Sequence, residues 1–309
     1  MSLTAHLERG TVRIGTLTVG EGPAVVIGGP GTDARRIGLR DHHGGTPAAD
    51  AVAAVRAGWA GPVVVEPFSA ADLPQIAEAA DGVVVGAAWM QDFGLVRAVA
   101  RLGLPVIVQR GPAATLQEWL AVADYCVAEG NDRVVLCESG SRTRQAGPAL
   151  DLALMRAARH RSGRPVLADL GDDPALAAAA VAAGADGLLL APGATERTAL
   201  AAQEAVKVVG ALTRPETPGT VVAARGAIDR VDAALAVLLE RRAELAGVVQ
   251  GLKPVGGFAG RDMERERRLV AEMARRAPGL GEARLAPIMN AVIEAGLHLA
   301  EERRNGDRS

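Results

Sequence analysis

Residues 82–109 read GVVVGAAWMQDFGLVRAVARLGLPVIVQ, and this stretch decides the fold class of the first part of the chain. The runs 82–86 and 105–109 are continuously apolar, as in strands that are buried on both faces. A helix candidate, residues 94–102, lies between them. A strand, a helix and a second strand in this order predict a parallel α/β fold.

The same unit repeats on both sides of this stretch, up to about residue 212. Further strand candidates are residues 24–28, 63–67, 133–138, 165–170 and 187–191, separated by Ala-rich helix candidates. Seven or so units favour a barrel over an open sheet, although roughly 190 residues is short for a fold that typically needs about 250. Because residues 31–50 show no clear strand–helix unit, we expect a (β/α)8-type barrel that is trimmed there.

The pattern changes after residues 211–220, ALTRPETPGT, whose Pro, Gly and Thr content indicates a linker. Residues 221–252 form one long amphipathic helix candidate, and two more helices follow, the last from about Glu282 to Arg304. We expect a barrel over residues 1–212, a linker over 213–219 and a helical domain over 220–309. Three helices in about 90 residues cannot bury their apolar faces alone, so we expect dimerisation through the long helix.

Composition excludes several classes of function. The 309 residues are 49% hydrophobic with a formal net charge of −2, which permits a real core and argues against general binding to nucleic acid or membranes. No apolar run reaches about 18 residues, the length expected of a transmembrane helix. The first residues lack the basic and then apolar pattern of a signal peptide. We therefore expect a cytoplasmic protein. Cys126 and Cys137 have no metal or redox spacing and are expected to be packed, reduced thiols.

The stretch GRDMERERRLV, residues 260–270, has seven charged residues among its eleven. Asp262, Arg265 and Glu266 share one helix face, so this helix is either merely solvated or holds a ligand. The choice depends on whether other charges converge on the same place. The chain has only two lysines, Lys207 and Lys253, and a retained lysine hints at a site that needs a compact ammonium group.

Residues 220–302 contain a distinctive set of charged positions: Arg225 and Asp232, then ERRAELA (240–246), Lys253, RDMERER (261–267) and AGLHLAEE (295–302). In this pattern the segment resembles the all-helical chorismate mutase family. The resemblance implies the conversion of chorismate to prephenate by a homodimer, without cofactor or metal. Such a pericyclic reaction needs a folded substrate, Arg forks on its carboxylates and a fixed cation at the ether oxygen that becomes electron-rich.

The resemblance assigns a role to each charged residue of this pattern. Arg242 and Arg225 would bind carboxylates, with Arg225 reaching into the partner subunit's site. Lys253 would contact the ether oxygen and one carboxylate, and Arg265 would complete the cationic set. The substrate's ring hydroxyl would donate to Asp262 and Glu266. Catalysis is thus expected from Lys253, Arg265 and Glu266, and substrate binding from Arg225, Arg242 and Asp262.

One position departs from the family pattern. Where the family carries a Gln or Glu that donates to the ether oxygen, this chain has Ala300. His298, Glu301 and Glu302 are nearby substitutes, but each is turned about 100° or more away on the helix. The alternatives are a mutase or pyruvate lyase acting on amino-deoxychorismate or isochorismate, or a non-catalytic chorismate-binding protein.

Residues 11–205 resemble the barrel of DAHP synthase, in the type often fused to a chorismate mutase. The shared stretches are GGPG (28–31), GAAWMQDFGLV (86–96), PVIVQRG (105–111), AEGNDRVVLCESGSRT (128–143) and GADGLLL (184–190). The resemblance does not extend to the active site. The four metal-ligand positions of that family are Gly31, Asp172, Ala191 and Ala202 in this chain.

Two further positions that are cationic in the family are uncharged in this chain. Gln109 stands at the lysine of the KRG motif, and Ala88 stands at the arginine of the GARNMQ motif. Arg142 survives. We expect the barrel to bind no metal and to have no DAHP synthase activity. We expect it instead to act as a scaffold or regulatory module, whose partners could include another shikimate-pathway enzyme. The acidic run of Asp169, Asp172 and Asp173 is interpreted as a helix N-cap before Pro174.

Overall fold

The computed structural model describes residues 10–42, 47–143, 148–214, 216–253, 255 and 257–306. The first nine residues and residues 43–46 are among those that lie outside this part of the chain. The strands are β1 Val12–Ile14, β2 Leu17–Val19, β3 Val25–Gly28, β4 Ala34–Gly38, β5 Val63–Glu66, β6 Gly82–Val85, β7 Val106–Gln109, β8 Val134–Glu138, β9 Ser141–Arg142, β10 Pro148–Ala149, β11 Val166–Gly171 and β12 Gly187–Leu190. The α-helices are α1 Ala48–Arg56, α2 Leu73–Ala79, α3 Phe93–Ala100, α4 Leu116–Ala128, α5 Leu152–Ser162, α6 Ala177–Ala182, α7 Glu196–Thr213, α8 Val221–Leu252, α9 Met263–Arg276 and α10 Gly281–Gly306. Short 3-10 helices are η1 Leu39–His42, η2 Ala70–Asp72, η3 Ala87–Trp89, η4 Pro174–Leu176 and η5 Phe258–Gly260.

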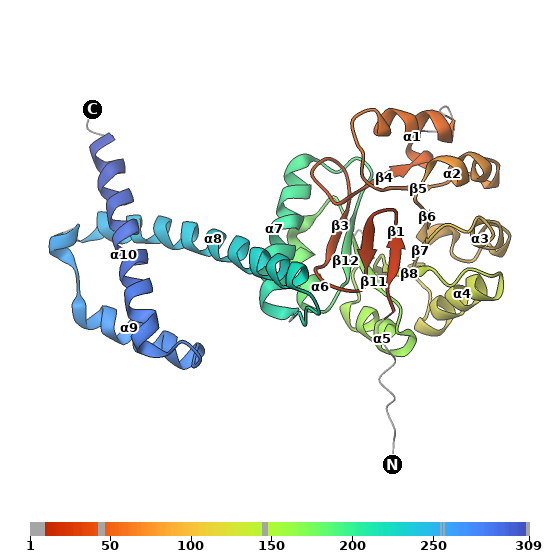
Figure 1. Cartoon of the computed structure of the whole chain (residues 1–309). Coiled ribbons are helices and arrows are strands. Elements are labelled where there is room, and N and C mark those ends of the chain that lie inside the picture. The colour runs from red at the N-terminus through yellow and green to blue at the C-terminus, as the bar shows by residue number, and fades with distance from the viewer. Residues whose placement is uncertain are drawn as a thin grey trace, which may run out of the picture. The chain divides into compact units, whose positions relative to one another are not determined.

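Eight parallel strands close into a barrel in the order β3-β4-β5-β6-β7-β8-β11-β12, with β12 returning to β3. Helices α1 to α7 surround the strands (Figure 1). The predicted α/β barrel is therefore confirmed. Each of the seven strand candidates from the sequence corresponds to a barrel strand, because buried parallel strands carry the continuous apolar runs by which they were identified.

The barrel is trimmed in a different way from the sequence prediction. Residues 31–50 do contain a strand, β4, which pairs with β3 and β5 and completes the ring. The reduction lies in the connection before it, because residues 29–33, all of them described, join β3 to β4 without a helix. The sequence shows no clear strand–helix unit in this segment because ARRIG, residues 34–38, lacks the apolar run of the other strands.

A second core fills the barrel lumen. The antiparallel hairpin β1–β2 packs Val12, Ile14 and Val19 against inward side chains such as Ile27 and Leu189. The larger core lies between the strands and the surrounding helices and includes the fully buried Trp119. The two cores are the two faces of strands that are buried on both sides.

Charged side chains close the carboxyl-terminal end of the lumen. Arg36 of β4 is buried, and its guanidinium contacts Glu66 at 3.0 Å and Asp169 at 3.9 Å. The Gln109 side chain also donates to Asp169, at the same carboxylate oxygen that faces Arg36. Burial raises the pKa of Asp169 despite the nearby Arg36 cation. The residues of this cluster therefore contact one another at the end of the lumen.

Side-chain caps fix the starts of several barrel helices. Thr115 and Glu118 form a reciprocal capping box at α4, and Asp92 and Asp151 accept backbone hydrogen bonds at α3 and α5. Asp173 caps η4 before Pro174, as the sequence indicated.

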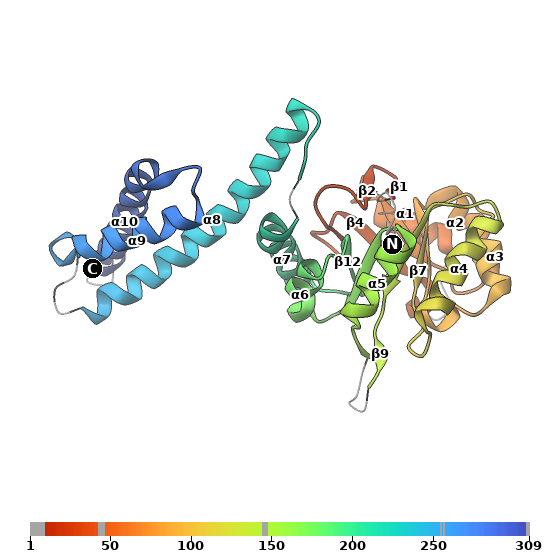
Figure 2. The same ribbon diagram turned by 90° about the horizontal axis from the view of Figure 1, so that it is seen from below.

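Helix α8 has the bounds that the sequence predicted and runs without a break (Figure 2). The chain divides into two compact units, residues 1–227 and 228–309. In the second unit α9 packs against α10. Every helix in the described part of the chain is too short or too polar to cross a bilayer.

Candidate active site

The helical unit contains a cavity of about 270 Å³ between α8, α9 and α10. Its apolar wall consists of Leu245, Ala246, Val249, Leu269, Ile293 and Leu297, with Gly257 and Gly260 at the α8–α9 connection. Its polar lining consists of Arg242, Gln250, Lys253, Arg261, Asp262, Arg265 and Glu266. Five of the six residues singled out in the sequence thus line one cavity, although they come from two helices and a loop.

The period of α8 brings two of these cations together. Arg242 lies on α8 and Lys253 directly follows its last residue. They are eleven residues apart, which is close to three full helical turns, so both side chains reach the cavity from the same side. Lys253 is half-buried, and its Nζ donates to the backbone oxygen of Gly260 at 2.8 Å. Gln250 accepts from the backbone nitrogen of Gly257 at 2.7 Å. These two bonds fix the connection against the end of α8.

Arg261 was not singled out individually by the sequence, although it lies within RDMERER. Its guanidinium donates to both carboxylate oxygens of Glu266, at 3.1 and 2.6 Å, and also to Asn290 and Glu294 of α10. The bidentate pair raises the pKa of Arg261 and fixes the orientation of the Glu266 side chain. No sequence signal separates Arg261 from Arg267 or Arg268, because only the folded α10 supplies its other partners.

Asp262 is the N-cap of α9. One carboxylate oxygen accepts from the backbone nitrogens of Glu264 and Arg265, at 3.2 and 2.9 Å. The bond from Arg265 is the main reason that the pKa of Asp262 lies below its usual value. This residue therefore has a structural role, and only its second oxygen is left for a ligand.

Two guanidinium groups in the cavity lack an anionic partner. Arg242 is half-buried and donates only to the backbone oxygen of Val292, at 3.3 Å. The side chain of Arg265 makes no hydrogen bond or ion pair with the described residues. Burial, and then repulsion by Arg265, lower the pKa of Arg242. A cavity that holds two such cations beside Lys253 is suited to a ligand with more than one negative charge.

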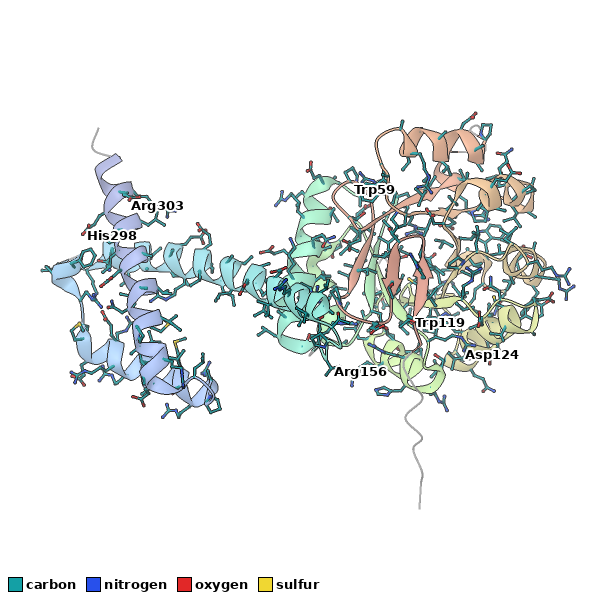
Figure 3. All side chains as sticks on the ribbon, in the orientation of Figure 1. Trp59, Trp119, Asp124, Arg156, His298 and Arg303 are labelled. Carbon is teal, nitrogen blue, oxygen red and sulfur yellow. The ribbon has the colours of Figure 1, made fainter. Side chains whose placement is uncertain are left out.

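Arg225 and Ala300 do not line the cavity. Arg225 is exposed on α8, and its 17-residue separation from Arg242 corresponds to about 25 Å along the helix. Ala300 lies one turn beyond Leu297 on α10 and is half-buried. Of its possible substitutes, His298 is exposed and packs on Phe258 with ring centroids 5.1 Å apart (Figure 3).

The barrel does not assemble the metal site that the resemblance would require. Ala202 is fully buried in α7, and Gly31 and Ala191 have no side-chain donor. Asp172 is exposed and is the one potential ligand of the four. No group of three or more His, Cys, Asp or Glu residues suited to a metal occurs in the described ranges. Of the acidic run, only Asp173 acts as the expected cap, because Asp169 points to Gln109 in the lumen.

Comparison with known families matches both parts of the chain. The DAHP synthetase I family matches residues 43–207, and chorismate mutase type II matches residues 224–301. The two matches correspond to the barrel and to the helical region.

Individual relatives cover only part of the chain. A phospho-2-dehydro-3-deoxyheptonate aldolase of Thermotoga maritima is 34% identical over 137 residues, which are 41% of this chain and 40% of that protein. A 2-dehydro-3-deoxyphosphooctonate aldolase of Acidithiobacillus ferrooxidans is 29% identical over 147 residues, 42% of this chain and 52% of that protein. The chain thus spans about half the length of these curated relatives or less.

Solved structures support the fold. The crystal structure of a DAHP synthase of Thermotoga maritima superposes with a TM-score of 0.58 at 24% identity, covering 68% of this chain and 76% of that one. A truncated form of the synthase from the same organism gives a TM-score of 0.57 at 24% identity, with coverages of 68% and 95%. At this identity the likeness concerns the barrel fold.

Proposed function

Because the chain belongs to the DAHP synthetase I family and carries a chorismate mutase type II domain, we propose that it converts chorismate to prephenate in its helical unit. The barrel in this proposal is a non-catalytic scaffold or regulatory module.

The observation that carries the proposal is the charge of the cavity between α8, α9 and α10. Arg242, Lys253 and Arg265 face it without an anionic side-chain partner among the described residues, whereas Arg261 is occupied by Glu266. Chorismate carries two carboxylates and an ether oxygen that gains negative charge as the bond breaks. Three cations around a small cavity match these three groups, because guanidinium forks bind carboxylates in a bidentate way.

The proposed mechanism requires no nucleophile and no proton transfer. Arg242 and Arg265 would hold the two carboxylates so that the enolpyruvyl side chain lies over the ring, which places the atoms that bond close together. The Lys253 ammonium, which is fixed by Gly260, would stabilise the developing charge on the ether oxygen. Glu266 would accept a hydrogen bond from the ring hydroxyl, and Arg261 would hold its carboxylate in place.

The α10 side of the cavity supports a second candidate substrate. This helix contributes only Ile293 and Leu297 to the lining, and Ala300 on the same face cannot donate a hydrogen bond. The alternative is therefore a mutase or pyruvate lyase that acts on a chorismate relative, amino-deoxychorismate or isochorismate. A cavity wall without a hydrogen-bond donor at Ala300 would also be expected of a non-catalytic chorismate sensor.

The absence of DAHP synthase activity is also part of the proposal. Three of the four metal positions have no donor, and the Arg36 guanidinium already forms ion pairs with Glu66 and Asp169 at the end of the lumen. A hard divalent cation needs several oxygen or nitrogen ligands, and the described residues do not supply them at one place.

Dimerisation through α8 would complete the helical site. Its exposed apolar side chains include Ile228, Val231, Leu235 and Leu238, and a stable chain rarely leaves such a face uncovered. Arg225 lies too far along α8 to reach its own cavity, so a partner would have to supply it in trans. Other proposed partners are limited to an enzyme of the same pathway.

The test uses the full-length protein after treatment with a chelator. Loss of chorismate would be followed by absorbance, the product identified by NMR and mass spectrometry, and isochorismate and amino-deoxychorismate assayed in parallel. Prephenate formation is the expected result. Turnover of isochorismate or amino-deoxychorismate alone would identify that compound as the substrate. Binding of chorismate without turnover of any of the three compounds would identify a sensor. DAHP synthesis after metal is added back would refute the proposal for the barrel.

A further inference from the structure

A second cavity lies in the barrel. It has a volume of about 790 Å³, within the roughly 300–1,000 Å³ of small-molecule sites. Its lining residues directly follow β6, β7 and β8, so it opens at the carboxyl end of the parallel strands. The lining is Ala87, Ala88, Met90, Gln91, Gly111, Pro112, Ala113, Ala114, Glu118, Ser139, Arg142 and Thr143.

Arg142 is the single cation in this lining. Its backbone nitrogen donates to the oxygen of Pro112 at 3.3 Å, which holds strand β9 against the loop after β7. Its guanidinium forms no ion pair with the described residues and is therefore available to a ligand. One planar fork matches one carboxylate.

Glu118 limits the total negative charge of a ligand. Its carboxylate accepts from both the backbone nitrogen and the hydroxyl of Thr115, at 2.7 and 2.8 Å. These bonds lower the pKa of Glu118, so an anion faces the cavity at neutral pH. A ligand with two or more negative charges would be repelled, whereas a monoanion can place its charge on Arg142 and its uncharged part near Glu118.

The remaining wall favours an apolar ligand body. It consists largely of Ala, Gly, Pro and Met side chains, which offer surface for burial but few hydrogen bonds. Ser139 adds one polar group: its hydroxyl oxygen is buried and has no hydrogen-bond partner of ordinary geometry in the described chain, although it lies near the Cys137 thiol. A buried hydroxyl of this kind favours a ligand that supplies an acceptor or donor.

From this combination we propose that the barrel cavity binds a small monocarboxylate with an apolar, ring-sized body. The carboxylate pairs with Arg142, and the body lies on the wall formed by Ala87, Ala88, Ala113 and Ala114. A phosphate group does not suit this cavity, because tight phosphate binding uses several cationic or backbone donors and only one cation is present in the lining.

Tryptophan fluorescence reports on the barrel and not on the helical unit. The three tryptophans, Trp59, Trp89 and Trp119, are all in the barrel, and the first and last are labelled in Figure 3. Trp89 ends η3, whose other two residues, Ala87 and Ala88, line the cavity. Binding in the helical unit has no tryptophan to perturb, so failure of this proposal is distinguishable from failure of the proposed mutase.

The experiment titrates the full-length protein with cyclohexanecarboxylate, which does not absorb at the excitation wavelength. Cyclohexanol serves as the uncharged probe and inorganic phosphate as the second anion. The expected result is a saturable change with the carboxylate and much weaker binding of the other two. Arg142→Gln should weaken carboxylate binding by about 10- to 150-fold, and Ser139→Ala by about two- to tenfold.

Arg133→Gln is the matched control. Arg133 is also exposed, but it precedes β8 at the opposite end of that strand. This variant should bind as the parent does. The proposal is overturned if the carboxylate gives no saturable change, if Arg142→Gln and Arg133→Gln behave alike, or if phosphate binds more tightly than the carboxylate.

Discussion

Replacing Lys253 tests the proposed chemistry most directly. Its ammonium donates one hydrogen bond to Gly260, which leaves two N–H groups for a ligand in the cavity. A unit charge about 4 Å from a developing oxyanion is worth about 4 kcal/mol at an effective dielectric constant near 20. Lys253→Ala should therefore lower kcat by about 10²- to 10³-fold, the range found when one transition-state donor is removed.

The assay separates this effect from simple loss of binding. The initial rate of chorismate loss would be measured over a range of concentrations for the parent, for Lys253→Ala and for Lys253→Arg. The arginine variant keeps the charge but not the compact ammonium, so it should recover binding better than turnover. Lys207→Ala, which changes the chain's other lysine on α7, is the control and should leave both parameters unchanged. Turnover of Lys253→Ala within about threefold of the parent would refute the assignment, because a loss of only about 0.65 kcal/mol excludes a direct contact with the reacting oxygen.

Three other outcomes follow from the structure. Ala300→Gln should raise kcat/KM for chorismate by up to about 10²-fold by restoring a donor, and an unchanged value would show that the ether oxygen is served from elsewhere. Glu138→Gln should destabilise the barrel by about 3–5 kcal/mol in denaturant titrations, because Glu138 and Arg110 form a fully buried ion pair that the change breaks; a loss below about 1 kcal/mol would contradict this. Burial raises the pKa of Cys126 to about 11, so only about one thiol in a thousand is ionised at pH 8. A thiol reagent should therefore label Cys126 after unfolding but not in the native protein. The labelling rate should rise with pH, because the thiolate is the reactive form.

The sequence by itself determined the elements that rest on local patterns. The continuous apolar runs located seven barrel strands, and the helical period of residues 221–252 fixed both ends of α8. The sequence pattern also singled out Arg242, Lys253, Asp262, Arg265 and Glu266, five residues that line one cavity. The identification of Arg225 as a residue acting in trans stays a prediction.

Tertiary structure alone decided the positions where charged residues are stabilised by distant partners. Strand β4 has two arginines and no apolar run, and Arg36 is accommodated there because Glu66 and Asp169 arrive from other strands. In the same way, Arg261 holds Glu266 only because Glu294 and Asn290 of α10 pack beside it. A side chain's burial and charge balance depend on groups far away in the sequence, so no local pattern reveals them. The sequence therefore determined which elements form, and the fold decided which charges are paired within the protein and which are left for a ligand.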